Sequence, residues 1–431
     1  MRLDPRSRVA LALALAAWAL AAPSRVRAQS TAYSTNYPPS VRAAGMAGCS
    51  NAVFWGGDVD SWSNPALLGY QSGLRYENAR SQLIPDFASD VFFTSKRVFA
   101  GGGGLGFVFA GKPWRGAGSV RLDYGPSPFT SPTGEYLGTF DAHEDVDTWG
   151  VGLSVGRAAE ALSRALTGHA PGILRYADVA LGMNHKDVTL ALSPDNVGFP
   201  TSGTGKGKAD DRGIFFRLSP YNSFAGPGRL AGLDRALRVA VDAAYGTSKL
   251  NRGQPPVYFP ALDQQDAMLE ERHRGWSARI AVHPRVLERE LDDRHLRWLE
   301  QSLLPAVSFG AAWDRNTLDY QGFDPSTDTF FPARSHIVNR GWELTFLNLV
   351  SVRHGHVSDP NGSIHGTSSG WSVGYTFARC VGFRYDRATV PEAIDAFTGM
   401  RLADVHRRAW STFVDPLRVI AFRRGEALDK P

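Results

Sequence analysis

The residues that could support chemistry in this chain are few, and their spacing fits known sites poorly. Gly101, Gly103 and Gly106 match the G-x-G-x-x-G spacing of a nucleotide-binding loop. That loop requires a helix whose N-terminus meets the pyrophosphate. The alternating segment 105–109 (Leu-Gly-Phe-Val-Phe) predicts a strand at this place instead. We therefore interpret the glycines as a hairpin turn.

Histidine and acidic residues occur in small groups that could be offered as metal ligands. His354 with His356 is one group, and residues 143–145 (His-Glu-Asp) are another. Neither comes with a second spaced pair, as a zinc site requires. Residues 58–60 (Asp-Val-Asp) lack the further oxygen ligands of a calcium loop, and hydrolytic catalysis cannot be assembled from neighbouring residues of the sequence. We predict a chain that is not an enzyme and that needs no metal and no cofactor.

Length and composition favour a large all-β protein. The chain has 431 residues, of which 43% are hydrophobic and 11% aromatic, and it contains 45 glycines. Its mean hydropathy is −0.23. Beyond residue 28 no apolar run approaches the roughly 20 residues that a membrane-spanning helix needs. The length allows two or three ordinary domains or one large barrel.

The N-terminus has the organisation of a secretory signal peptide. Arginines within residues 2–8 precede an apolar stretch over 9–22, and residues 26–28 (Val-Arg-Ala) form a small-residue cleavage site. We predict that residues 1–28 are this signal peptide. Their removal takes away five arginines and one aspartate and lowers the formal net charge from +5 to +1. A basic surface for nucleic acid is therefore not expected.

After Pro65 the sequence divides into segments in which apolar side chains alternate with small or polar ones, as in 149–156 and 371–378. This is the period of a strand with two different faces. In a soluble sandwich the apolar face would be buried between sheets, whereas in a membrane barrel it would contact lipid. The predicted signal peptide, the segment length of about ten residues and the recurring aromatic residues favour the barrel. The recurring tryptophans are Trp149, Trp276, Trp313, Trp342 and Trp371.

We predict an all-β fold, a transmembrane antiparallel β-barrel of about 14 strands, since single-chain bacterial barrels have an even number. The expected strands are 73–83, 89–99, 103–112 with 118–125, 145–156, 173–192, 212–220, 236–249, 273–284, 304–317, 337–346, 349–357, 368–377, 380–388 and 406–414. Connectors after even strands are short or helix-like (157–167, 226–235 and 285–303), and these should face the periplasm. Those after odd strands are longer and should face outward (126–144, 193–211, 250–272, 318–336 and 389–405).

Between the signal peptide and the first strand lies a glycine-rich stretch that suits a compact plug, because its small residues allow tight folding and Asn64-Pro65 stops any regular element. We predict an N-terminal extension and plug over 29–70, a barrel over 71–415 and a C-terminal tail over 416–431. The plug residues that we single out are Gly45, Met46, Gly48, Phe54, Trp55, Gly56, Gly57, Asp60, Asn64, Pro65 and Ala66.

Polar residues on the small face of the predicted strands are candidates to line the barrel lumen. They are Arg121, Asp123, Asp178, Asn184, Arg217, Asp242, Arg279, His283, Asp314 and Glu343. Their charges alternate in sign, so they predict either a self-paired network that stiffens the lumen, which we favour, or a path for a ligand. Cys49 and Cys380, the only cysteines, could form a disulfide or remain separate small hydrophobic residues.

The plug stretch resembles the N-terminal signature of FadL-type and PorV/PorQ-type outer-membrane barrels, roughly R-A-x-G-M-G-G-A…D-D…x-x-N-P-A-x-L. It is filled by Arg42, Gly45, Met46, Gly48, Asp60, Asn64, Pro65, Ala66 and Leu68, whereas Ala47 and Cys49 replace the usual second Gly and Ala. The segments 352–356, 370–375 and 406–413 look like the last strands of PorV-type barrels. Asp415-Pro416 departs from that pattern, because such barrels usually end on an aromatic residue.

The resemblance implies a protein of the outer membrane of a Gram-negative-type bacterium, in contact with outer-membrane lipid. It implies binding or passive transport of a hydrophobic small molecule, with residues 54–66 as the moving part and Gly56-Gly57 as the hinge. The alternative is a PorV-like secretion-system component that binds exported proteins. A soluble periplasmic β-sandwich is the third possibility.

Overall fold

The computed structural model describes most of the chain between residues 32 and 423. The described ranges are 32–56, 59–85, 88–111, 119–130, 133–168, 176–192, 203–224, 236–260, 263–285, 302–324, 329–359, 364–391 and 403–423. The predicted signal peptide, residues 1–28, lies outside these ranges, as do Gly57, the segment 226–235, residues 286–301 and the last part of the predicted tail, 424–431.

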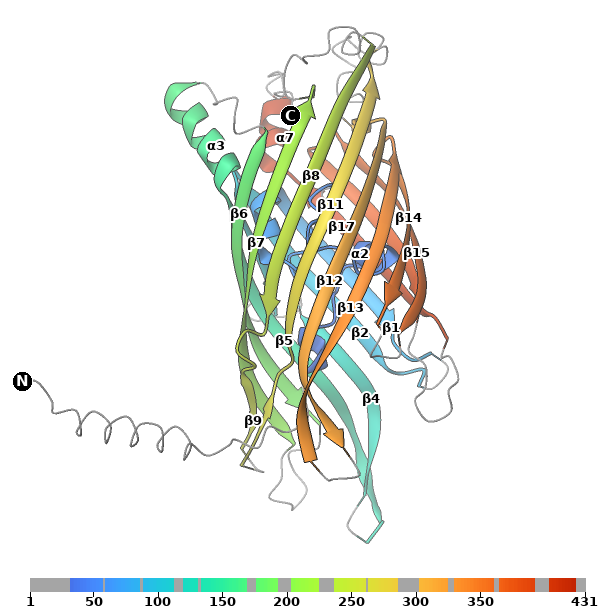
Figure 1. The fold of residues 1–431 in the computed structure, drawn as a ribbon. Helices are drawn as coiled ribbons and strands as arrows, with labels where there is room; N and C mark the ends of the chain where they lie inside the picture. Colours follow the sequence, from blue (N-terminus) through green and yellow to red (C-terminus); the bar gives the residue numbers. More distant parts are fainter. Residues whose placement is uncertain are drawn as a thin grey trace, which may run out of the picture.

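The described strands form a single antiparallel sheet that closes into a barrel (Figure 1). In chain order they are β1 (Gly73–Gln82), β2 (Phe92–Gly102), β3 (Leu105–Ala110), β4 (Val120–Thr130), β5 (Tyr136–Ser154), β6 (Ala177–Ala191), β7 (Thr204–Asn222), β8 (Leu237–Leu250), β9 (Pro256–Phe259), β10 (Gln264–Ala267), β11 (Glu270–Pro284), β12 (Val307–Asp324), β13 (Thr329–Phe346), β14 (Val350–Ser358), β15 (His365–Phe377), β16 (Val381–Val390) and β17 (Val405–Val414). Pairing of β1 with β17, with Leu74 opposite Val414, closes the ring.

The wall of the barrel has fourteen strand positions. Of the seventeen strands in the described sheet, β3 and β4 share one position, because each pairs with both β2 and β5. The strands β9 and β10 form a hairpin in the connection between β8 and β11, and β9 pairs with β7. The predicted all-β barrel of about 14 strands is therefore confirmed.

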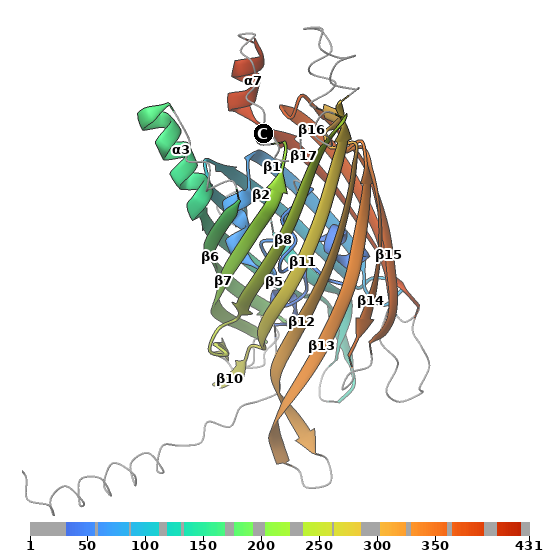
Figure 2. The same ribbon diagram turned by 45° about the horizontal axis from the view of Figure 1, so that its top comes forward.

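The helices of the described part are short. They are η1 (Tyr33–Thr35), α2 (Val41–Gly45), η2 (Pro65–Tyr70), α3 (Val155–Thr167) and α7 (Pro416–Arg423). The segment that carries η1, α2 and η2 runs inside the barrel, as Figure 2 shows for the blue elements. We call described residues 32–70 the plug. Among the residues that the structure describes, no helix is long and apolar enough to span a bilayer.

The two ends of the barrel differ. At one end, which we call the helix end, lie α3 and α7 at the top of Figure 1, together with the tight turns at 103–104, 347–349 and 378–380. At the other end, which we call the hairpin end, lie the β9–β10 hairpin and the long extensions of β4 (Figure 1) and β13 (Figure 2). The predicted helix-like connector at 157–167 is part of α3, and it lies at the helix end.

Two predicted outer connectors are largely strand in the structure. In the range 126–144, β4 continues to Thr130 and β5 begins at Tyr136. In the range 318–336, β12 continues to Asp324 and β13 begins at Thr329. The prediction that these ranges are connectors was wrong because it assumed that every strand has an apolar face. A ladder of backbone hydrogen bonds needs no apolar face once the hairpin leaves the hydrocarbon layer.

The faces of the wall settle the choice between a barrel and a sandwich. Apolar side chains point outward, and Trp149 and Trp276 are 46% and 59% exposed. The inner face of the same strands carries small, polar and charged residues that are buried, such as Asp242 and Ser277. The apolar faces do not meet across an interior, so the wall is that of a transmembrane barrel.

The plug packs on the backbone of the wall along a row of glycines. Gly101, Gly106, Gly152, Gly182 and Gly213 lie opposite one another on neighbouring strands, and we call them the glycine row. A methyl group on Gly106 would lie 2.0 Å from the carbonyl oxygen of Leu68, and one on Gly182 would lie 2.3 Å from that of Pro65. Because these positions have no side chain, η2 and the residues beside it reach the wall directly.

Candidate functional site

The carboxylate of Glu343 on β13 is the centre of a buried ionic contact between plug and wall. It accepts hydrogen bonds from Arg42 Nε at 2.9 Å and Arg42 Nη2 at 2.7 Å, a bidentate pair. It also accepts from Trp55 Nε1 at 3.1 Å and from Arg353 Nε at 2.6 Å. Arg353 in turn donates to Asp386 at 2.9 Å. Paired charges of this kind can be buried because each neutralises the other and the remaining lone pairs are satisfied.

Two further wall residues hold the plug by its backbone. Asp314 on β12 accepts from the amide nitrogens of Ser50 at 2.7 Å and Asn51 at 2.9 Å. Asn184 on β6 donates from Nδ2 to the carbonyl oxygen of Ser61 at 2.9 Å. These contacts fix the plug backbone at two places on the wall, one on β12 and one on β6.

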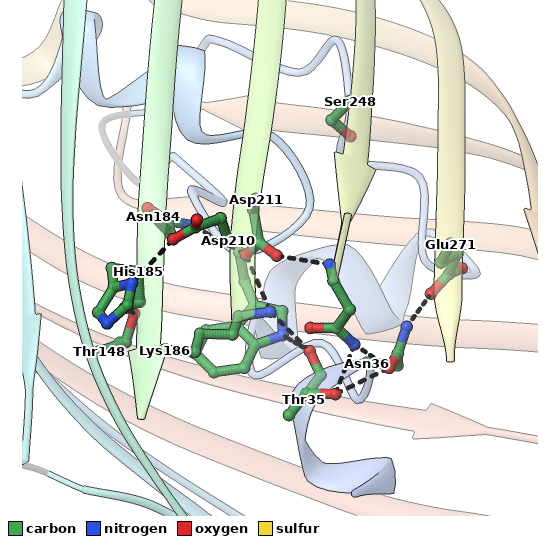
Figure 3. Close-up of polar contacts among 12 residues, drawn as sticks. Thr35, Asn36, Thr148, Asn184, His185, Lys186, Asp210, Asp211, Ser248 and Glu271 are labelled. Atoms are coloured by element: carbon green, nitrogen blue, oxygen red, sulfur yellow. Dashed lines mark hydrogen bonds and ion pairs between the residues drawn. The ribbon is translucent and has the colours of Figure 1, made fainter. Parts of the chain in front are cut away.

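A third contact, shown in Figure 3, holds the part of the plug nearest the hairpin end. Lys186 and Asp211 form an ion pair at 2.9 Å in which neither side chain is exposed. Lys186 Nζ also donates to the carbonyl oxygen of Thr35 at 2.8 Å, and it lies 4.4 Å from the ring centre of Trp62. The lysine therefore joins two wall strands to two separate parts of the plug.

The predicted plug residues that the structure describes lie inside the barrel. Asn64 accepts from the amide of Ala66 at 3.1 Å and donates to the carbonyl of Asn51 at 2.9 Å. Asp60 accepts from Ser63 Oγ at 2.8 Å. The residues described are Gly45, Met46, Gly48, Phe54, Trp55, Gly56, Asp60, Asn64, Pro65 and Ala66, and Gly57 lies outside the described ranges.

The structure places eight of the ten predicted lumen residues on the inner face of the wall. They are Asp178, Asn184, Arg217, Asp242, Arg279, His283, Asp314 and Glu343. Several bind neighbours or the plug: Asp178 accepts from Tyr70 Oη and Ser154 Oγ, both at 2.5 Å, and Asp242 accepts from Ser219 Oγ at 2.5 Å. In these contacts the partners are a tyrosine of the plug and serines of the wall, not other members of the predicted set.

Arg121 and Asp123 are the two exceptions, and the prediction that they face the lumen is wrong. They lie on the outer face of β4, where Arg121 is 3.8 Å from Asp145. Val120 and Leu122 are buried on the inner face instead. The reason is that β4 lies at the hairpin end, where the outer face has left the hydrocarbon layer and charged side chains are solvated there.

The same reversal occurs at the hairpin end of the strands from β2 to β7 and is clearest on β6. Toward the helix end its outer face carries Val179 and Leu181, and its inner face carries Gly182 and Asn184. Beyond Lys186 the inner residues are Val188 and Leu190, which are fully buried, and the outer ones are polar. The interior beside these strands is therefore apolar, whereas the inner residues of β11 at the same end include Glu271 and His273.

These inner residues form what we call the hairpin-end cluster. It comprises Val91, Phe93, Ala110, Val120, Leu122, Val146, Val188, Leu190, Ala209, Val257, Phe259 and Met268 from the wall and the β9–β10 hairpin, with Ala32 and Trp62 from the plug. Tyr37 packs against Phe93 with ring centres 4.5 Å apart. The cluster was not predicted from the sequence. The signal for it was that the apolar residues of β6 change from one face of the strand to the other at Lys186.

The third strand position changes from β3 to β4 beside the hairpin-end cluster. β3 ends at Ala110 and β4 begins at Val120. Ala110 lies opposite Thr148 and Val120 lies opposite Val146, so only one residue of β5 separates the two pairs. The amide of Lys96 on β2 donates to the carbonyl of Ser119 at 2.8 Å, and Ala110 and Val120 both belong to the cluster.

The described residues contain no group of three or more His, Cys, Asp or Glu side chains that could hold a metal ion. His354 and His356 lie on the outer face of β14. Cys49 and Cys380 are both free and buried, so the disulfide considered above is not formed. Cys49 lies in the plug, where burial raises the pKa of its thiol.

These features define a closed, plugged transmembrane β-barrel. No family model and no curated protein matches the chain. Solved structures that it resembles include the toluene transporter TodX of Pseudomonas putida, with a TM-score of 0.38, 10% identity and coverage of 90% of this chain and 99% of that one. The toluene transporter TbuX of Ralstonia pickettii gives 0.35 and 12%, covering 88% and 98%.

A third similar structure is a FadL homologue of Pseudomonas aeruginosa, with a TM-score of 0.33, 11% identity and coverage of 90% of this chain and 100% of that one. FadL is one of the families that the plug motif resembles. Matches with identities and TM-scores as low as these do not indicate a substrate for this chain. A function must therefore be inferred from the residues of the chain itself.

Proposed function

We propose that this chain is exported by residues 1–28 to the outer membrane of a Gram-negative-type bacterium and acts there without catalysis. It would bind a hydrophobic small molecule in the hairpin-end cluster and let it pass by displacement of the plug. The orientation follows from the connectors, since barrels of this kind have short turns in the periplasm and long loops outside. The hairpin end would then face the exterior.

The observation that carries the proposal is the reversal of polarity on the inner face of the wall. A lumen that served only to stiffen the barrel could be polar throughout. Here apolar side chains from five wall strand positions, β2 to β7, and from the β9–β10 hairpin converge above the ionic contacts. An apolar interior of this kind is the environment that a small hydrophobic compound prefers to water.

The plug supplies the element that would have to move. Ala32 and Trp62 belong to the cluster, so a ligand that entered it would replace these two residues. We propose that the ligand leaves through the wall when residues 54–66 move about Gly56-Gly57.

The test replaces one cluster residue and its neighbour on the opposite face. Leu190→Asn puts an amide into the hairpin-end cluster, and Thr189→Asn puts the same group on the outer face of the same strand. Binding of a small aromatic hydrocarbon to the purified barrel is measured by quenching of tryptophan fluorescence. We expect Leu190→Asn to weaken binding about tenfold or more, because a buried amide costs about 1–3 kcal/mol. Equal binding by both variants would refute the proposal.

The secretion role is a second candidate, and one observation favours it. The helix α3 at the helix end carries Leu162 and Leu166 on its surface, 61% and 76% exposed. Exposed leucines on an amphipathic helix suit a protein partner in the periplasm. Co-purification of secretion-machinery proteins, lost in a Leu162→Ser, Leu166→Ser variant, would support this role, and an unchanged hydrocarbon affinity in that variant would separate the two functions.

A further inference from the structure

A hollow lies on the outer face of the wall across four neighbouring strands, β11 to β14. Its volume is about 580 Å³. Ala278 and Ala311, directly opposite each other on β11 and β12, form its floor, and the larger side chains of Trp276, Phe309 and Trp342 stand around them. Because this face of the barrel contacts lipid, a hollow with such a lining suits a hydrocarbon chain.

Three arginines gather at the edge of this hollow nearest the hairpin end. Arg340 lines the hollow and lies opposite Trp313. One step further along the strands, Arg274 and Arg315 lie directly opposite each other. All three are exposed on the outer face. We call them the arginine cluster.

The arginine cluster lacks the acidic partners that would offset its charge. Within the described part of the chain, none of the three arginines forms an ion pair. The acidic residues Glu270 and Asp319 further along β11 and β12 are engaged by Arg272, at 2.9 and 3.3 Å. Like charges placed directly opposite on neighbouring strands repel each other. An external anion would relieve this repulsion.

The position of the cluster relative to the bilayer identifies the anion. Along β11 the outward residues run Val282, Ile280, Ala278 and Trp276 and then change to Arg274. Along β12 the same change occurs after Trp313, at Arg315. Aromatic residues mark the boundary between hydrocarbon and headgroups, so the arginines lie at the depth of lipid headgroups in the leaflet at the hairpin end.

We propose that this face of the barrel binds a lipid with phosphate groups on its headgroup, such as the phosphorylated glycolipid of an outer leaflet. One acyl chain would occupy the hollow over Ala278 and Ala311, and the phosphates would lie among Arg274, Arg315 and Arg340. Guanidinium groups suit this role because they bind phosphate through two parallel hydrogen bonds. The apolar hollow beside the cluster favours a lipid over free phosphate.

The chain contains a matched control on the other side of the barrel. Arg387, Arg408 and Arg80 lie opposite one another on β16, β17 and β1 and are also exposed on the outer face. They lie outside the hollow, and Arg80 is held over the ring of Phe92 at 3.9 Å. This second set carries the same charge without a place for an acyl chain beside it.

The test titrates the purified full chain in non-ionic detergent with an acylated disaccharide that carries two phosphate monoesters. Bound lipid is counted by native mass spectrometry. We expect the Arg274→Gln, Arg315→Gln, Arg340→Gln variant to lose about tenfold or more in affinity, since one charge-assisted hydrogen bond contributes roughly that much. The Arg80→Gln, Arg387→Gln, Arg408→Gln variant should change much less.

Two further measurements separate a lipid site from a simple anion site. Ala311→Phe fills the hollow without removing a charge and should weaken binding of the phosphorylated lipid, and Ala278→Val serves the same purpose if the first variant does not fold. Inorganic phosphate should not compete, and the lipid after phosphatase treatment should bind weakly. Equal losses in the two arginine variants, full affinity after the hollow is filled, or competition by free phosphate would each overturn the proposal.

Discussion

The contact at Glu343 leads to a quantitative prediction about how firmly the plug is held. We consider Glu343→Gln, which keeps the shape of the side chain and removes its charge. Arg42 then loses its carboxylate partner in a site where both side chains are 2% exposed. Removing one partner of a buried ion pair costs about 3–5 kcal/mol. Because Asp386 still neutralises Arg353, we expect the low end of this range, about 3 kcal/mol.

Cys49 reports the opening of the plug. Its side chain is fully buried, its Sγ lies 3.6 Å from the carbonyl oxygen of Ala312, and burial raises the pKa of its thiol. A thiol reagent can therefore reach it only when the plug leaves the wall. In a Cys380→Ser background, a loss of about 3 kcal/mol should speed alkylation of Cys49 about a hundredfold, because 1.4 kcal/mol corresponds to a factor of ten.

The control is Asp242→Asn. Asp242 is also a buried wall carboxylate, but its hydrogen bond goes to Ser219 of the wall. Alkylation should stay close to the wild-type rate in this variant. If Cys49 were alkylated as slowly in Glu343→Gln as in the wild type, the ion pair would not be what holds the plug. The same conclusion would follow if Asp242→Asn accelerated the alkylation of Cys49 as much as Glu343→Gln does.

Two further predictions concern the other contacts of the plug. Gly182→Ala should destabilise the folded barrel by about 1–3 kcal/mol through overpacking, because its methyl group would lie 2.3 Å from the Pro65 carbonyl; Gly102→Ala, where nothing lies within 4 Å, should leave the midpoint of heat-modifiable gel migration unchanged. Lys186→Met leaves the carboxylate of Asp211 buried without its lysine partner, so limited proteolysis should cleave the plug near Thr35 faster than in the wild type. The control is Lys208→Met, which removes a lysine that is 75% exposed. Equal cleavage rates in the two variants would contradict the role given to Lys186.

Much of the wall could be predicted from the sequence because each spanning strand places two different environments on its two faces. This signal is seen in neighbouring residues such as Trp276 and Ser277 or Trp371 and Ser372, where an outward tryptophan is followed by an inward serine. The signal fails where the environments change. Beyond the hydrocarbon layer Arg121 faces water and Leu122 faces the interior, so a rule that places charges inside the lumen gives the reverse of the observed faces.

The contacts of the plug could not be predicted in the same way. The motif around Arg42 and Asn64 indicated a plug, but Arg42 meets Glu343 across 301 positions of sequence. Which wall carboxylate it meets depends on the closure of the ring and on the register of every strand between them. Lys186 and Asp211 were absent from the predicted site for the same reason, since nothing local marks their ion pair or the contact of Lys186 with Thr35.

The glycine row has a consequence for how the molecule is assembled. Where η2 touches the wall, main chain rests on main chain, and Arg42 would have no neutralising partner in a plug separated from the wall. A barrel that closed first would thus have to admit the N-terminal segment while the charge of Arg42 was still unpaired. The segment is better regarded as a template, around which successive hairpins are added until β17 joins β1 and encloses it.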